Sequence, residues 1–158
     1  KNKIKGIIHK NIKNISNLRV LDLSHNKLSY KIPIEIGNLL NLEKIVLYDN
    51  KLIGNIPVLN NLTKLKHLIL CYNKLNDNIS DYSFTNLQNL EIIDFRNNRL
   101  YGNIPEDIGS LNKLKKINLS KNNFSGIITS KIFTLPKLKV IGLDDHNFNN
   151  KIDHIITD

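Results

Sequence analysis

A repeat of about 24 residues runs through the chain and constrains its fold more than any single residue does. The pattern Leu-x-x-Leu-x-Leu-x-x-Asn, with Ile or Phe in place of some leucines, first runs from Leu18 to Asn26. It begins again at Leu42, Leu65, Leu90, Leu114 and Leu138. A unit this short cannot bury its apolar side chains alone, so successive units must pack on one another in a solenoid.

The repeat covers residues 1–158 as one array. A partial unit occupies residues 1–17, and further units begin at residues 18, 42, 65, 90, 114 and 138. The last unit is incomplete, with His146 where the asparagine is expected. We therefore expect the array to belong to a longer protein. No apolar run reaches the ~20 residues of a membrane helix, so we expect membrane contact only through flanking segments.

Each unit contains a short stretch with the alternation of a β-strand. In the first complete unit Leu21 and Leu23 point to one face and Asp22 to the other. Stacked units place these strands side by side in a parallel sheet, at a spacing of about 4.8 Å. Aromatic residues make up only 6% of the chain, so the shared core must be aliphatic.

An asparagine follows each strand. Its amide can donate and accept hydrogen bonds, so it can pair backbone groups of adjacent turns where the chain leaves the sheet. These residues form a predicted structural ladder of Asn26, Asn50, Asn73, Asn98 and Asn122, preceded by Asn2 in the partial unit. We expect a local irregularity at His146, because histidine replaces only part of this role.

The second half of the unit is also regular. Residues 52–57 and 100–105 share the pattern Leu-x-Gly-Asn-Ile-Pro. Apolar residues then recur every three to four positions, which predicts one or two turns of 3₁₀ or α-helix on the outer side. Unit length varies in this outer segment, with one residue fewer over 58–64 and one more over 80–89.

With these motifs the chain resembles the leucine-rich repeat family over essentially its whole length. Residues 52–57, 100–105 and 36–39 resemble the plant-type subclass. The resemblance implies an α/β solenoid, a right-handed superhelix with a concave parallel β-sheet and short 3₁₀, α-helical or irregular segments on the convex side.

The plant-type subclass also has a second short sheet on one flank. We expect this sheet to be broken where its usual residues are replaced. The glycine is replaced at Tyr30, Asp77 and Asn150, and the proline at His9, Ser80, Thr129 and Asp153.

The resemblance implies a non-enzymatic recognition module, part of a receptor-like or secreted protein, because family members bind proteins, peptides or saccharides. The residues agree with this interpretation. Cys71 is the single cysteine, so a cysteine-based zinc motif is excluded. Strand geometry separates Cys71 from His67 by about 13 Å, too far for a nucleophile–base pair. We expect no catalytic residues, no metal site and no cofactor.

A protein or peptide ligand is expected on the concave face. Outward positions there carry aliphatic and tyrosine side chains that a merely solvated surface does not require. With two charged neighbours they form the predicted ligand-binding patch of Val20, Val46, Tyr48, Ile69, Tyr72, Ile92, Asp94 and Arg96. The alternative explanation is that strands favour β-branched residues on either face.

A row of basic residues follows the asparagine ladder. This basic stripe consists of Lys3, Lys27, Lys51, Lys74 and Arg99. In a chain of net charge +9, such a stripe offers an alternative function, binding of an acidic saccharide or another polyanion. The alternative explanation is that these residues form an ordinary solvated surface without a ligand. We expect no nucleic-acid partner.

Five Asn-x-Ser/Thr sequences are candidate N-glycosylation sites: Asn14, Asn61, Asn78, Asn118 and Asn123. They favour an extracellular or cell-surface location, although the sequence Asn-Leu-Ser/Thr is itself part of the repeat. A cytoplasmic location, with the chain acting as an intracellular scaffold, is the alternative.

Overall fold

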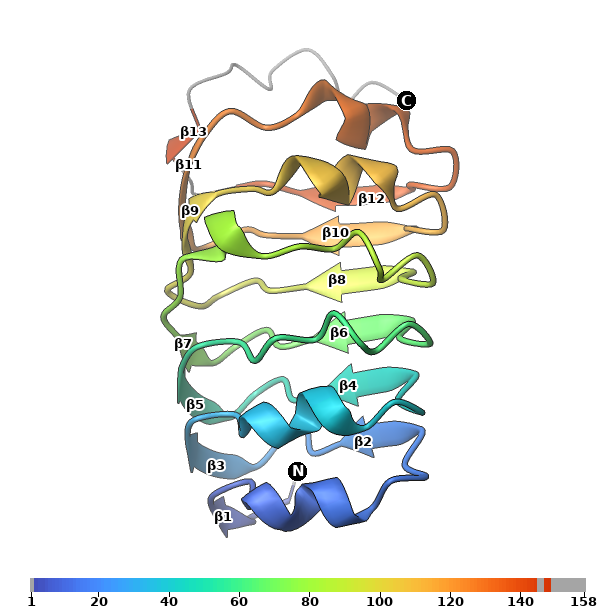
Figure 1. Cartoon of the computed structure of the whole chain (residues 1–158). Coiled ribbons are helices and arrows are strands. Elements are labelled where there is room, and N and C mark those ends of the chain that lie inside the picture. Colours follow the sequence, from blue (N-terminus) through green and yellow to red (C-terminus); the bar gives the residue numbers. More distant parts are fainter. Residues whose placement is uncertain (1, 145–146, 149–158) are drawn as a thin grey trace.

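The computed structural model describes residues 2–144 and 147–148 and shows a solenoid in which each repeat makes one turn (Figure 1). Each turn has a short strand on one side and a helical or irregular segment on the other, and the turns stack in sequence order. The predicted solenoid is confirmed, and all its helical elements in the described residues are 3₁₀ helices.

A six-stranded parallel sheet forms the face that the sequence predicts to be concave, which we call the sheet face. Its strands are β2 (Val20–Asp22), β4 (Lys44–Val46), β6 (His67–Ile69), β8 (Ile92–Asp94), β10 (Lys116–Asn118) and β12 (Val140–Gly142). Neighbouring strands pair through equivalent repeat positions, for example Leu21 with Ile45 and Ile45 with Leu68. Equivalent side chains of successive repeats therefore lie side by side.

The core is one continuous apolar cluster inside the turns, predominantly aliphatic as predicted but with Phe84, Phe95 and Phe124 buried in it. Leu47, Leu70 and Phe95, which occupy the same position just after the strand in three consecutive repeats, are almost completely buried in it. Each turn covers the apolar side chains of the turn before it, which is how a unit too short for its own core becomes stable.

A flanking sheet lies beside the main one and is divided in two. One part contains β1 (Lys5–Gly6), β3 (Lys27–Tyr30), β5 (Lys51–Gly54) and β7 (Lys74–Leu75). The other contains β9 (Tyr101–Asn103), β11 (Asn123–Gly126) and β13 (Asn147–Phe148).

The break lies at Asp77, where one was predicted. The Asp77 carboxylate accepts hydrogen bonds from the Ile56 backbone N–H at 3.0 Å and the Tyr82 hydroxyl at 2.7 Å. The chain is thereby held away from regular strand pairing. An isolated bridge between Asn78 and Tyr101 joins the two parts, together with the Arg99 N–H, which donates to the Leu75 carbonyl at 2.8 Å.

The prediction of a break at Tyr30 is wrong. Tyr30 adopts the left-handed backbone conformation itself, with φ of 67°, as Gly54 does with φ of 74° in the next turn. Strand pairing therefore continues between β3 and β5. It also continues between β11 and β13 despite Thr129, whereas Asn150 and Asp153 lie outside the described residues.

Five 3₁₀ helices lie opposite the main sheet in the described residues. They are η1 (Lys10–Asn14), η2 (Ile34–Asn38), η3 (Ile79–Asp81), η4 (Glu106–Ser110) and η5 (Ser130–Thr134). The turn that is one residue short has no helix between β5 and β6. A cavity of about 540 Å³ opens there, between Ile34, Val58 and Tyr82.

Candidate functional site

The sheet face presents most of the predicted ligand-binding patch. Val20 and Tyr72 are exposed, whereas Val46, Ile69 and Ile92 on the three central strands are half-buried. Their side chains project because every second strand residue points away from the core. Val46 lies in register with Ile69, and Ile92 lies one strand further on and two residues earlier, so the three side chains form a diagonal apolar strip.

Asp94 differs from the predicted surface position, because its side chain is buried. The Lys116 ammonium lies 3.5 Å from the Asp94 carboxylate, and the Arg96 guanidinium lies 3.7 Å from it. A buried carboxylate needs such partners, since an unpaired charge away from water is strongly destabilising. Asp94 therefore positions the two cations, whose side chains remain partly exposed, over itself and is not open to a large ligand.

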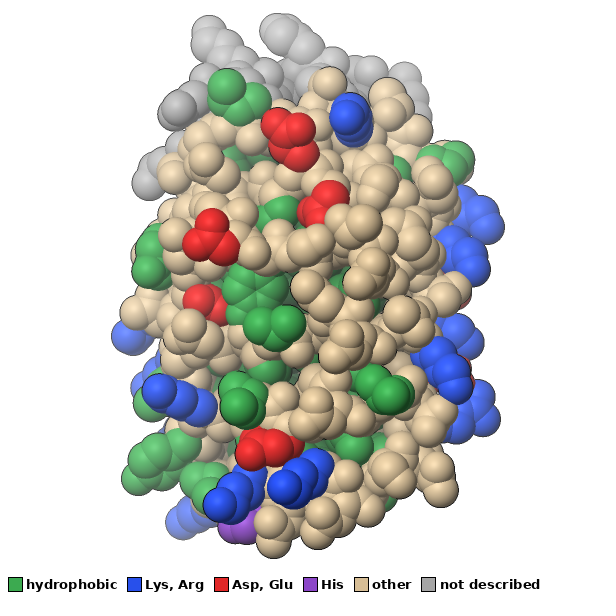
Figure 2. All heavy atoms as spheres, viewed as in Figure 1, with side chains coloured by type: hydrophobic (Ala, Val, Ile, Leu, Met, Phe, Trp, Pro, Cys, Tyr) green, Lys and Arg blue, Asp and Glu red, His purple; other side chains and the backbone are tan. Residues whose placement is uncertain are grey.

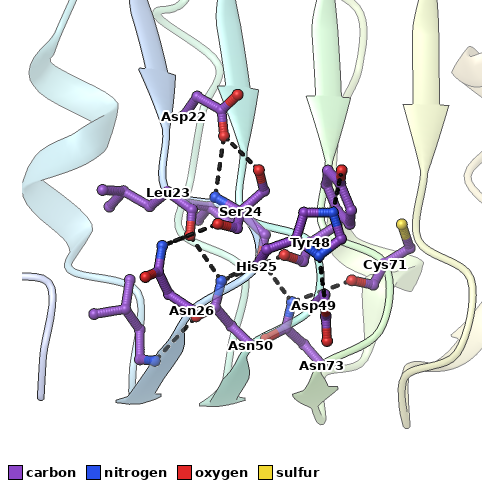
Figure 3. A network of polar contacts seen from close by, with 12 residues as sticks. Asp22, Leu23, Ser24, His25, Asn26, Tyr48, Asp49, Asn50, Cys71 and Asn73 are labelled. Carbon is purple, nitrogen blue, oxygen red and sulfur yellow. Dashed lines mark hydrogen bonds and ion pairs between the residues drawn. The ribbon is translucent and has the colours of Figure 1, made fainter. Parts of the chain in front are cut away.

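Three residues of the sheet face, Asp49, His25 and Tyr48, are joined in a chain of hydrogen bonds (Figure 3). His25 Nδ1 lies 2.7 Å from an Asp49 carboxylate oxygen, and the Tyr48 hydroxyl lies 2.7 Å from His25 Nε2. The rings of His25 and Tyr48 meet edge to face, with centroids 4.5 Å apart. The sequence analysis missed this chain, although His25 and Asp49 occupy equivalent positions in consecutive repeats.

These side chains line a cavity of about 430 Å³ that is open to solvent on the sheet face. It is lined by His25, Tyr48, Asp49, Ile69, Cys71, Tyr72, Asp94 and Arg96. The Arg96 guanidinium carbon lies 5.0 Å from the centre of the Tyr72 ring, within cation–π distance. A concave, largely apolar pocket with a few fixed polar groups is the usual form of a ligand site.

The turn after each strand explains why these residues meet. His25, Asp49 and Tyr72 have φ of 54°, 56° and 55° in the left-handed region. Each backbone N–H donates across to the next repeat, as His25 does to the Tyr48 carbonyl at 3.0 Å and Tyr72 to the Arg96 carbonyl at 2.9 Å. The tight turn brings all three side chains to one end of the sheet.

The thiol of Cys71, in the cavity wall, is a poor nucleophile at neutral pH. Burial, together with the negative charge of Asp94 beside it, raises the pKa of Cys71 to about 11. Only the thiolate is a nucleophile, so Cys71 contributes packing and a weak hydrogen-bonding group at neutral pH.

The asparagine ladder makes the hydrogen bonds that hold the turns together. Asn73, for instance, accepts from the Leu52 N–H at 3.0 Å and donates to the carbonyls of Leu47 and Leu70 at 3.0 Å each. Asn26, Asn50, Asn98 and Asn122 make equivalent bonds. Asn2 pairs through its backbone N–H with the His25 carbonyl, and His146 lies outside the described residues.

The basic stripe runs along one edge of the flanking sheet, where Lys27, Lys51 and Lys74 begin β3, β5 and β7. Lys3, Lys27, Lys51, Lys74 and Arg99 are all exposed, and none forms an ion pair with another described residue. Their charges are therefore free to act on a solution anion.

Lysine and arginine side chains also gather along the opposite edge of the molecule (Figure 2). Acidic residues partly neutralise this edge, because Glu43 pairs with Lys66 and Arg19, and Glu91 pairs with Lys115. The Lys66 and Arg19 hydrogen bonds lower the pKa of Glu43 to about 2, and Lys115 lowers that of Glu91.

The five glycosylation sequences differ in their surroundings. Asn14, Asn61, Asn78 and Asn123 are exposed. Asn78 accepts from the Ser80 N–H at 3.1 Å, and Asn118, half-buried on the sheet face, accepts from the Ser120 N–H at 3.1 Å.

The described part of the chain has neither a metal-binding cluster nor a membrane-spanning helix. Its His, Cys, Asp and Glu side chains include no group of three or more that could hold a metal ion. None of its helices has the length and apolar character needed to cross a membrane.

Family models and solved structures agree with this architecture. A model described as leucine rich repeat matches residues 63–124, and a model of two leucine rich repeats matches residues 16–61. Comparison with curated proteins gives no match.

Similar solved structures include three plant receptors. The plant peptide hormone receptor RGFR1, in complex with RGF2, is 34% identical with a TM-score of 0.90 over 94% of this chain and 24% of that one. The ectodomain of the Arabidopsis thaliana receptor kinase GASSHO1/SCHENGEN3, in complex with CASPARIAN STRIP INTEGRITY FACTOR 2, is 33% identical with a TM-score of 0.87 over 93% of this chain and 18% of that one.

The third is the ectodomain of the Arabidopsis receptor kinase HAESA, in complex with an N-terminally extended IDA peptide hormone. It is 34% identical with a TM-score of 0.86, over 93% of this chain and 25% of that one. This chain thus spans a quarter or less of the length of these receptors.

Proposed function

Because this chain is a leucine-rich repeat protein of the plant-type subclass, we propose that it is a non-enzymatic recognition module that binds a peptide or protein segment along the sheet face. The observation that carries the proposal is the cavity beside the apolar strip of Val46, Ile69 and Ile92. The three similar receptors are complexes with peptide or protein ligands, which supports the same class of partner here.

Tyr72 adds a second argument. It is 43% exposed, and its backbone is left-handed, a conformation that costs a residue other than glycine roughly 1–2 kcal/mol. Asn97 occupies the equivalent position in the next repeat, and asparagine tolerates this conformation better. An exposed tyrosine at a position that disfavours it is consistent with a binding role.

The first test is selection from a phage-displayed library of random linear peptides on the wild-type chain. Selected peptides are expected to bind the Tyr72→Asn variant about tenfold or more weakly, because a central aromatic anchor is lost. Stability should stay within about 0.5 kcal/mol, since relief of backbone strain offsets the lost contact with Arg96. Isothermal titration and urea denaturation measure the two effects separately.

Tyr101→Ser is the matched control, because Tyr101 is a similarly exposed tyrosine on the flanking sheet. Peptides that bind all three proteins equally would contradict the proposal. The polyanion function makes the opposite prediction, a steep loss of binding with salt and on the double substitution Lys27→Gln and Lys51→Gln.

An extracellular or cell-surface location fits the proposal, since similar structures are receptor ectodomains. Glycopeptide mapping of native protein is expected to find glycans at the exposed Asn14 and Asn61, while Asn118 on the sheet face stays unmodified. Native protein without glycan at any of the five sequences would favour the intracellular scaffold.

A further inference from the structure

Tyr48 is held so that its hydroxyl offers a hydrogen-bond acceptor to the sheet-face cavity. An ionised carboxylate only accepts, so the proton between Asp49 and His25 sits on Nδ1 of the imidazole. In neutral histidine the other nitrogen, Nε2, is then an acceptor. While His25 is neutral, the Tyr48 hydroxyl therefore donates its proton to Nε2 at 2.7 Å, which leaves only oxygen lone pairs for a ligand.

The charged groups of the cavity have ion-pair partners, although the buried Arg96 Nε has no hydrogen-bond partner among the described residues. Asp49 is bonded to His25, and Asp94 lies between Arg96 and Lys116. A ligand ammonium group would meet these two cations, and a ligand carboxylate would meet the two aspartates and the acceptor face of Tyr48. The walls of Tyr48, Tyr72 and Ile69 are apolar, so a neutral planar group fits best.

We propose that this cavity is a specificity pocket for one side chain of the bound peptide, a neutral aromatic group whose tip donates a hydrogen bond. This proposal rests on the proposed function, the binding of a peptide along the sheet face. Tyrosine and tryptophan have this chemistry. Phenylalanine fills the same apolar space but leaves the Tyr48 oxygen without a partner. The pocket therefore discriminates by one hydrogen bond, which is worth about three- to tenfold in affinity.

A double-mutant cycle tests the pocket by combining one change in the protein, Tyr48→Phe, with one change in the ligand, a tyrosine probe replaced by a phenylalanine probe. N-acetyl-L-tyrosinamide and N-acetyl-L-phenylalaninamide are titrated into the ¹⁵N-labelled chain and followed by NMR. Both are expected to shift the amides of Tyr48, Cys71, Tyr72 and Arg96, with the tyrosine probe about three- to tenfold tighter. Tyr48→Phe should abolish this preference and leave the affinity for the phenylalanine probe unchanged.

Two further variants complete the design. Tyr101→Phe, on the flanking sheet, should change neither affinity. His25→Asn keeps a residue that tolerates the left-handed turn but removes the acceptor of the Tyr48 proton, so the tyrosine preference should shrink. The proposal would be refuted by equal affinities for both probes or by a preference that survives Tyr48→Phe. It would also be refuted if the amide shifts were confined to residues outside the cavity.

The pocket and the proposed function fail in distinguishable ways. Library peptides that bind the sheet face without a tyrosine or tryptophan in the cavity would refute the pocket alone. Probe binding in the cavity, with no library peptide bound to the sheet face, would refute the proposed function and leave the pocket intact.

Discussion

Replacing Asn122 by alanine is expected to lower the free energy of unfolding by about 3 kcal/mol. Asn122 is buried, accepts from the Leu100 N–H at 3.1 Å, and donates to the carbonyls of Phe95 and Leu119 at 2.9 and 3.0 Å. Alanine leaves the Leu100 N–H and the Leu119 carbonyl without their side-chain partner in the interior, where water cannot replace it. Urea denaturation followed by circular dichroism measures the change.

The neighbouring residue provides a control for this substitution. Asn123 is exposed, so Asn123→Ala should change stability by no more than about 0.5 kcal/mol. Similar losses in both variants would mean that the asparagine side chain does not hold the turns together, and that the stability resides in the aliphatic core alone.

Asp107→Ala is expected to cost about 2–3 kcal/mol, because one carboxylate oxygen holds a whole loop. That oxygen accepts from the backbone N–H groups of Phe84 and Thr85 at 2.7 and 3.0 Å. It also accepts from the hydroxyls of Ser83 and Thr85, each at 2.9 Å. These residues belong to the turn that is one residue longer than the others, and Asp107 in η4 fixes the extra length against the next turn.

Glu106→Ala is the matched control, since Glu106 is the exposed neighbour of Asp107 in the same helix. It should be neutral within about 0.5 kcal/mol. In native-state hydrogen exchange, Asp107→Ala should also release the Phe84 amide while the strand amides stay protected. Unchanged protection at Phe84 would contradict this role for Asp107.

The hydrogen bonds that join Asp49, His25 and Tyr48 could not be predicted from the sequence. Equivalent positions in consecutive repeats placed His25 beside Asp49, but only the tertiary structure shows that the imidazole bridges Asp49 and Tyr48. The burial of Asp94 was likewise unpredictable, because it depends on how Arg96 and Lys116 fold over it. Tyr30 preserved strand pairing by adopting a backbone conformation that its residue type disfavours.

The sequence alone determined the solenoid, the aliphatic core and the order of residues on the sheet face. It could do so because a fixed repeat makes every residue the neighbour of its equivalent one turn away, so spacing along the chain becomes position in space. The tertiary structure decided the cavity, the direction of its hydrogen bonds and the pairing of its charges. These depend on side-chain orientation and burial within a few ångströms, which no periodicity in the sequence specifies.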